Sequence, residues 1–333
     1  MPVAYHSHQA AGTSEGVRSV VKRDELPPNP NDTYVVPAWK VVYVSVPKAA
    51  CTSLKWLIAG LSGESPDEFG PALRPEVTRA TTIHRRAKWL HTPRLHDLSD
   101  DQLAEIGTES GWFVFTVVRH PTARLWSAWQ SKFLLREPHF VRRFADEPWL
   151  PDVPSTTADV ATDFRTFVLA RASELGRRVG RDPHFRPQKR LLTPDVTPYD
   201  HVYRTAEITA LRSDLTTHLL AQGWDGSLRM PNNNETPLPL LRSMLTPDVT
   251  DAIQQVYAAD LRTFGFGDVT PEGLSTDLEY PPGLLDEVRR LVERSERIGD
   301  LAQIARELQQ DNESLREEIA ALRAEPGANG SDR

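Results

Sequence analysis

The apolar residues of this chain form short continuous runs, and each run is followed by a segment with helical spacing. Lys40–Val46 and Trp112–Val118 are rich in β-branched and aromatic residues and are bounded by turn residues, the pattern of strands buried on both faces. The first run leads into a predicted helix at Cys51–Leu61, and the second leads into a helix that begins near Pro121. A third short strand is predicted at His201–Arg204.

Further helices continue this alternation. Ser99 is a typical N-cap for a short helix, and residues 207–221 and 248–264 have helical patterns. Strands that alternate with helices favour a parallel sheet with helices on its faces. We therefore predict an α/β protein whose ligand lies beyond the carboxyl ends of the strands, at helix N-termini.

The two ends of the chain differ in composition from this central part. Residues 1–36 are polar and rich in Pro, Asn and Asp, which predicts a flexible arm before a folded domain over residues 37–270. Residues 284–325 have the pattern of a coiled-coil helix, and residues 326–333 that of a disordered tail.

The coiled-coil prediction depends on leucines spaced by seven. Placing them at heptad position d puts β-branched or small residues and one asparagine at position a, the pattern of a parallel two-stranded coil. Charges agree with this register, because Asp311 would face Arg316 and Glu318 would face Arg323 across two chains. We predict a parallel homodimer through residues 291–325; a single amphipathic helix packed on the domain is the alternative. The d positions are Leu301, Leu308, Leu315 and Leu322, and the a positions are Ile298, Ala305, Asn312 and Ile319.

Composition narrows the classes of function. Of the 333 residues, 39% are hydrophobic and 26% charged, which indicates a folded core rather than general disorder. The net charge of −7 argues against a broad nucleic-acid surface. Cys51 is the one cysteine, the N-terminus lacks the apolar core of a secretory signal, and no apolar run is long enough to span a membrane. These features predict a cytoplasmic protein with no membrane span and no nucleic-acid partner.

The loop after the first predicted strand has the chemistry of an anion site. It reads Pro47-Lys48-Ala49-Ala50-Cys51-Thr52-Ser53 and lacks the glycines of the GxxxxGK[ST] motif. Free backbone N–H groups and the helix dipole meet at such a point, Lys48 adds a charge, and Thr52 and Ser53 add hydroxyl donors. This combination suits a phosphate or a sulfate. The alternative is a structural turn with an ordinary helix cap and a surface lysine.

The loop after the second predicted strand, with the helix that follows it, carries two side chains that could bind a second anion. Arg119 follows the strand directly, and Ser127 lies eight residues later, about two helical turns away. Both side chains can therefore meet the same anion, with the guanidinium forked on two of its oxygens. The alternative is an arginine paired to an acid and a serine that faces solvent.

Together the two loops resemble those of the Golgi-type carbohydrate sulfotransferases. "PKAACTSLKWL" is similar to their 5′-phosphosulfate loop, and "RHPTARLWSA", Arg119–Ala128, is similar to their 3′-phosphate motif. Three later segments match in order, so that the resemblance covers about residues 38–267. The chain departs from these relatives because it lacks their paired cysteines and has His120 where many carry Asp. The later segments are His184–Gln188, Tyr199–Ile208 and Val256–Phe266.

The resemblance implies a sulfotransferase fold, a P-loop-like parallel sheet flanked by helices. It implies the sulfuryl donor 3′-phosphoadenosine 5′-phosphosulfate (PAPS), the product 3′-phosphoadenosine 5′-phosphate (PAP), and a hydroxyl of a carbohydrate or glycoconjugate as acceptor. The loop from Pro47 to Ser53, with Lys48 and Thr52, would hold the 5′-phosphosulfate, and Arg119 and Ser127 would hold the 3′-phosphate. The chemistry requires no metal, and no metal-ligand pattern occurs in the chain.

The catalytic groups follow from the logic of group transfer. Lys48 is placed to neutralise charge on the leaving nucleotide. A base must take the proton of the acceptor hydroxyl, and histidine is the commonest base near neutral pH. His84, in a basic segment, is the favoured base and His184 the next; His91, His96 and Glu207 stay open. For Cys51 a packed thiol is favoured over a nucleophile, because the transfer needs no covalent enzyme intermediate.

Two other functions compete with the sulfotransferase. A P-loop-like nucleotide kinase or NTPase predicts GK[ST] and an acidic Mg²⁺ ligand after a strand, neither of which is evident. An inactive dimeric scaffold with a sulfotransferase fold is the second alternative, and the intact Lys48, Arg119 and Ser127 argue against it.

Overall fold

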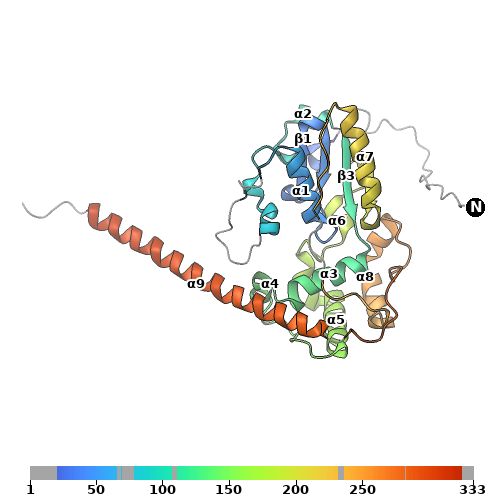
Figure 1. The fold of residues 1–333 in the computed structure, drawn as a ribbon, viewed down its shortest axis with the longest axis vertical. Helices are drawn as coiled ribbons and strands as arrows, with labels where there is room; N and C mark the ends of the chain where they lie inside the picture. The colour runs from blue at the N-terminus through green and yellow to red at the C-terminus, as the bar shows by residue number, and fades with distance from the viewer. Residues whose placement is uncertain are drawn as a thin grey trace, which may run out of the picture.

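The computed structural model describes residues 21–65, 69, 79–106, 111–231, 236–281 and 283–324. Its strands and helices alternate through the first two thirds of the chain, and a single long helix ends it (Figure 1). The strands are β1 (Thr33–Val36), β2 (Val41–Val44), β3 (Phe113–Val118) and β4 (His201–Arg204). The helices are α1 (Cys51–Leu61), α2 (Asp100–Ala104), α3 (Pro121–Trp129), α4 (Pro138–Arg143), α5 (Thr157–Ala172), α6 (Gln188–Leu192), α7 (Ile208–Ala221), α8 (Pro247–Thr263) and α9 (Leu284–Ala324), with a π-helical turn at Gln130–Leu134 and several short 3-10 turns.

The four strands form one sheet in the order β1-β2-β3-β4. β2, β3 and β4 run parallel, whereas β1 pairs antiparallel with β2 and occupies an edge. The predicted α/β fold, a parallel sheet flanked by helices, is confirmed, with one antiparallel strand added to it.

Strand β1 corrects the prediction of a flexible arm over residues 1–36. Thr33–Val36 is fully buried, and a tight turn with Lys40 in the left-handed region, at φ 50°, returns the chain into β2. The run Thr-Tyr-Val-Val is itself β-prone, and its pairing with β2 outweighs the polar composition around it. Residues 1–20 of the predicted arm lie outside the described residues.

Strands β1, β2 and β3 are buried on both faces of the sheet, and their side chains alternate between the faces as the strand period requires. On one face, tyrosines and phenylalanines of the strands pack against the leucines of α1 and α7. On the other face, Val42, Val44 and Val114 pack against Leu103 of α2 and Leu192 of α6. This arrangement leaves the carboxyl ends of β2 and β3 at one edge, where the chain enters α1 and α3.

A second apolar core lies below this edge and is built from helices. It joins α3, α4, α5 and α8 with the first turns of α9 around an aromatic cluster that includes Trp129, Phe133 and Phe164. Helix α5 begins at a capping box in which Thr156 and Asp159 satisfy each other's backbone N–H groups. Sequence reasoning did not predict α5, although this signal was available.

The first turns of helix α9 pack against the helical core, whereas its last turns are exposed to solvent. Val288, Val292 and Ala302 are buried, but the apolar residues from Leu308 onward are exposed. Figure 1 shows this part of the helix extending away from the body. A long helix is therefore present at Leu284–Ala324, whereas its association as a coiled coil stays a prediction. The predicted tail at residues 326–333 lies outside the described residues.

Candidate active site

A cleft of about 550 Å³ opens at the carboxyl ends of β2 and β3. It lies between the N-terminus of α1, the helix α3 with its π-helical turn, and the segment before α6. Most of the residues that the sequence proposed for the donor or for catalysis meet here. The lining residues are Lys48, Ala50, Cys51, Thr52, Thr81, His84, Arg85, Arg119, Ser127, Ser131, Lys132, Glu137 and His184.

The loop between β2 and α1 turns without glycine. Lys48 and Ala50 both adopt the left-handed backbone region, at φ 66° and φ 58°. Such a conformation costs about 1–2 kcal/mol for a residue other than glycine. Ala50 is the N-cap of α1 and supplies no side-chain acceptor, so the first N–H groups of the helix have no side-chain cap there. An anion at this point would satisfy them and meet the positive end of the helix dipole.

Arg124 of helix α3 fixes the loop between β2 and α1 by hydrogen bonds. Its guanidinium is buried and donates to three carbonyl oxygens: Pro47 at 2.9 Å, Arg186 at 2.8 Å and Pro183 at 2.6 Å. The first carbonyl belongs to the loop between β2 and α1, and the other two flank His184 in the sequence. One arginine therefore fixes the strained loop and the histidine segment relative to each other. The sequence motif contained Arg124, but sequence reasoning gave it no role.

Arg119 is fixed through its backbone. The Arg119 N–H donates to Gln188 Oε1 at 3.0 Å, and Gln188 Nε2 donates to the Arg119 carbonyl at 2.8 Å. Asp260 of α8 in turn accepts from the backbone N–H groups of Gln188 and Lys189. The side chain is left to face the cleft, where its described hydrogen bond, to the Lys48 carbonyl, is long at 3.4 Å. Burial and the nearby Arg124 lower the pKa of Arg119.

Lys48 lies among other cations. Burial, followed by the charge of Lys132, lowers its pKa to about 8; Arg119 also lowers it, while Cys51 opposes the shift. Cations gathered in a partly desolvated cleft repel one another, and a bound anion would relieve this repulsion.

His84 is engaged at both ring nitrogens. Its Nδ1 lies 3.3 Å from Lys55 Nζ, and its Nε2 lies 3.0 Å from Thr52 Oγ1. The Lys55 ammonium lies 3.5 Å from the Asp32 carboxylate and can only donate, so Nδ1 accepts and Nε2 carries the proton that Thr52 receives. Burial, followed by the charge of Lys55, lowers the pKa of His84 to about 2. His84, the base favoured from the sequence, therefore has no free lone pair with which to take a proton from a substrate hydroxyl.

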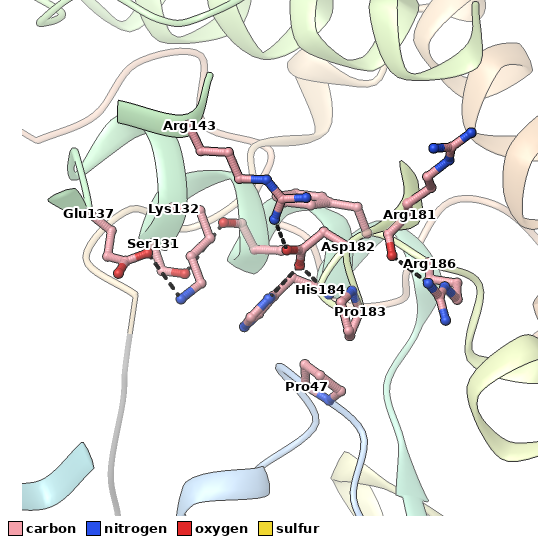
Figure 2. Close-up of polar contacts among 12 residues, drawn as sticks. Pro47, Ser131, Lys132, Glu137, Arg143, Arg181, Asp182, Pro183, His184 and Arg186 are labelled. Atoms are coloured by element: carbon pink, nitrogen blue, oxygen red, sulfur yellow. Dashed lines mark hydrogen bonds and ion pairs between the residues drawn. The ribbon is translucent and has the colours of Figure 1, made fainter. Parts of the chain in front are cut away.

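His184 has the opposite arrangement. Figure 2 shows the Asp182 carboxylate between the His184 ring and Arg143, at 2.8 Å from His184 Nδ1 and 3.2 Å from Arg143 Nη1. A carboxylate accepts, so Nδ1 carries the proton and Nε2 keeps its lone pair. Desolvation, followed by the charge of Lys132, lowers the pKa of His184 to about 3, against the opposing effect of Asp182. The ring is therefore neutral near pH 7.

The other candidates fall outside the cleft lining. The side chains of Pro47, Ala49 and Ser53 do not line it, and neither do those of His91 and His96. Glu207 accepts from the Arg204 backbone N–H in the capping box of the 3-10 turn Thr205–Glu207. His120 lies toward the Asp268 carbonyl. Cys51 lines the cleft as a free thiol.

Several lining residues were missed from the sequence. Thr81 and Arg85 flank His84 in the same basic segment, and Ser131, Lys132 and Glu137 follow Ser127. A signal existed for Ser131, which lies one helical turn after Ser127.

The fold and the cleft together indicate the class of protein to which this chain belongs. The cleft lies at the carboxyl edge of a parallel sheet and is lined by two lysines, two arginines and a helix N-terminus, an arrangement that suits a polyanionic ligand of an α/β protein. The model of the sulfotransferase family matches residues 31–267, more than half of the chain. The chain therefore belongs to the sulfotransferase family and is a sulfuryl-transferring enzyme. No curated protein and no solved structure matches it significantly.

Two further features bear on the class. Within the described ranges no helix is both long and apolar enough to cross a bilayer. No group of three or more histidine, cysteine and acidic side chains suited to a metal ion occurs among the residues that the structure describes.

Proposed function

We propose that this enzyme transfers the sulfuryl group of PAPS to a hydroxyl of a carbohydrate or glycoconjugate. The observation that carries the proposal is the cleft, which joins the Lys48 loop, Arg119 and Ser127 with a histidine whose acceptor nitrogen is available. The carbohydrate acceptor follows from the resemblance of the two loops to those of carbohydrate sulfotransferases.

The donor is held at two points. Lys48, Thr52 and the first backbone N–H groups of α1 bind the 5′-phosphosulfate, and the loop Pro47–Ser53 supplies the frame. Arg119 and Ser127 bind the 3′-phosphate. Ser53 is buried and contributes through its backbone N–H rather than its hydroxyl.

His184 is the general base in this proposal, in place of His84. Nε2 of His184 takes the proton as the acceptor oxygen attacks sulfur in line, and the bond from sulfur to the bridging oxygen breaks. Lys48 neutralises the charge that the leaving PAP gains on that oxygen. Asp182 orients the ring and stabilises its charged form, as the third member of a catalytic triad does. His84 instead orients the Thr52 hydroxyl in the donor loop.

The first test is donor binding, which needs no acceptor. Titration calorimetry with PAP should give one site on the wild type, and Arg119→Met should weaken it by about 10-fold or more, the loss expected of a charge-assisted contact. Arg190→Met, an arginine of α6 that does not line the cleft, is the matched control. A wild type that binds ATP with Mg²⁺ but not PAP would favour the kinase alternative. Acceptors are then screened with labelled donor against neutral and anionic glycans.

We also propose the parallel homodimer through residues 291–325. The part of α9 from Leu308 onward exposes an apolar stripe that includes Leu308, Leu315 and Leu322. Most helical stability in proteins comes from packing of an apolar face, and a second copy would bury this stripe and pair the Asn312 amides. A cytoplasmic location, expected from the single cysteine, stays a prediction.

A further inference from the structure

Lys132 is a second lysine in the cleft, and the donor contacts above leave it without a role. Its ammonium lies 3.5 Å from the Glu137 carboxylate, and both side chains line the cleft. The stem of Lys132 also brings the ammonium to 4.8 Å from the centre of the Phe140 ring. The ammonium is thus held between a carboxylate and an aromatic ring, and 19% of the side chain is exposed.

The backbone is distorted at the point that sets the direction of Lys132. A residue five positions after Ser127 would lie about 140° around an ideal α-helix, away from the serine. The turn Gln130–Leu134 is instead π-helical, and the Leu135 N–H donates to the Gln130 carbonyl at 2.8 Å. Bonding from residue i to i+5 brings residues five apart closer to one face, and such turns are rare and concentrated at functional sites. Ser127 and Lys132 accordingly line the same cleft.

The charges around Lys132 indicate where in the cleft its ammonium acts. Its charge is among the causes that lower the pKa values of Lys48, His84 and His184. These three residues line the cleft from three different segments of the chain. Figure 2 shows Lys132 and the His184 ring turned toward the side on which Pro47 lies. Lys132 is therefore close to the reacting centre.

We infer that Lys132 is a ligand of the transferring sulfuryl group, opposite Lys48, and that Glu137 holds its ammonium in position. This inference rests on the proposed function and extends it. A sulfuryl group between the attacking and leaving oxygens presents its remaining oxygens to the sides, and two ammonium groups on different walls bind them without crowding the in-line path. Glu137 keeps the long side chain ordered, which lowers the entropy lost on binding.

Comparing PAPS with PAP isolates this contact, because PAP has the same nucleotide but no sulfuryl group. Lys132→Met keeps an unbranched side chain and removes the charge. We expect it to weaken PAPS binding by about 10-fold and PAP binding by less than about 3-fold. Lys132→Arg should recover most of the PAPS affinity. The affinities are measured by titration calorimetry on the full chain.

A matched lysine–acid pair outside the cleft provides the control. Lys189 Nζ lies 3.0 Å from Asp195 on the surface, and Lys189→Met should change neither affinity. Equal losses of PAPS and PAP affinity in Lys132→Met, or no loss of either, would overturn the inference while leaving the proposed function intact. A wild type that binds neither nucleotide would overturn the proposed function and this inference with it.

Discussion

The lowered pKa of Lys48 makes donor binding depend on pH in a direction that the structure determines. In the empty cleft, burial and the charge of Lys132 lower this pKa to about 8, from an ordinary value of 10.5. A bound phosphosulfate places negative charge beside the ammonium and raises the pKa again. Binding must therefore take up a proton at pH values above about 8.

The magnitude follows from the two pKa values. If the bound pKa returns to about 10.5, the dissociation constant for PAP rises by about 10-fold between pH 7 and pH 9, and binding at pH 9 takes up about 0.9 proton. At pH 7 the lysine is charged in both states, so proton uptake at this site is about 0.1. The phosphates of PAP have second pKa values near 6, so the charge of each changes by only about 0.1 over this range.

Calorimetry measures both quantities. Titrations of PAP at pH 7, 8 and 9 give the dissociation constants, and buffers of different ionisation enthalpy give the number of protons taken up. Lys48→Arg keeps its charge throughout, so it should bind PAP with a dissociation constant that stays flat over this range. Lys48→Met should bind more weakly, and its affinity should be equally flat.

Two outcomes would refute this reasoning. A wild-type affinity that stays constant from pH 7 to pH 9 would mean that the Lys48 ammonium does not contact the nucleotide or is not desolvated in the cleft. The same slope in Lys48→Met as in the wild type would assign the proton to another group.

Three further predictions concern the base, the buried arginine and the long helix. Once an acceptor is known, His184→Asn should lower kcat by about 10²-fold or more with PAP affinity nearly unchanged, whereas His84→Gln should weaken PAP binding through Thr52; the reverse result would restore His84 as the base. Arg124→Met leaves three buried carbonyls without their donor and should lower the free energy of unfolding by about 3 kcal/mol or more, measured by urea denaturation. A chain that ends at Gln303 keeps the packed part of α9 and should be a monomer with full PAP affinity, whereas the full-length chain should be a dimer by light scattering; a monomeric full-length chain would contradict the coiled coil.

The sequence predicted correctly those helices and strands whose limits are set by residues close to them in the chain. Helix α1 begins and ends at the predicted residues because its apolar spacing and its N-terminal loop are contiguous in sequence. Strand β4 also matches its prediction, and the capping box of Ser99 with Gln102 starts α2 as expected. Strand β1 was missed because it is short and its stability comes from pairing with β2, which its polar neighbours conceal.

The sequence predicted those cleft residues that are recognised by their charge or their position after a strand. It did not predict which histidine nitrogen carries a proton, or which side chains of the following helix point into the cleft. Lys48, Arg119 and Ser127 follow from their positions after strands. The choice between the histidines depends on Lys55, which lies 29 residues from His84, and on Asp182, two residues before His184. The first partner cannot be read from the sequence, whereas the second lies close enough to have been considered. Lys132 was hidden by a π-helical turn, which no spacing rule for α-helices anticipates.

The segment from Gln130 to Arg143 connects the cleft with helix α9. It supplies Lys132 and Glu137 to the cleft, and Arg136 Nε lies 2.9 Å from Glu296 Oε1 of α9. Gly299 of α9 lies against Pro138, where a Cβ would approach the proline ring at 3.4 Å. The packed base of α9 therefore supports the wall that positions Lys132, and only the part beyond Ala302 is free to serve association alone. A truncation placed before Val292 would remove buried side chains and this support together, so a loss of binding in such a variant would say nothing about the oligomer.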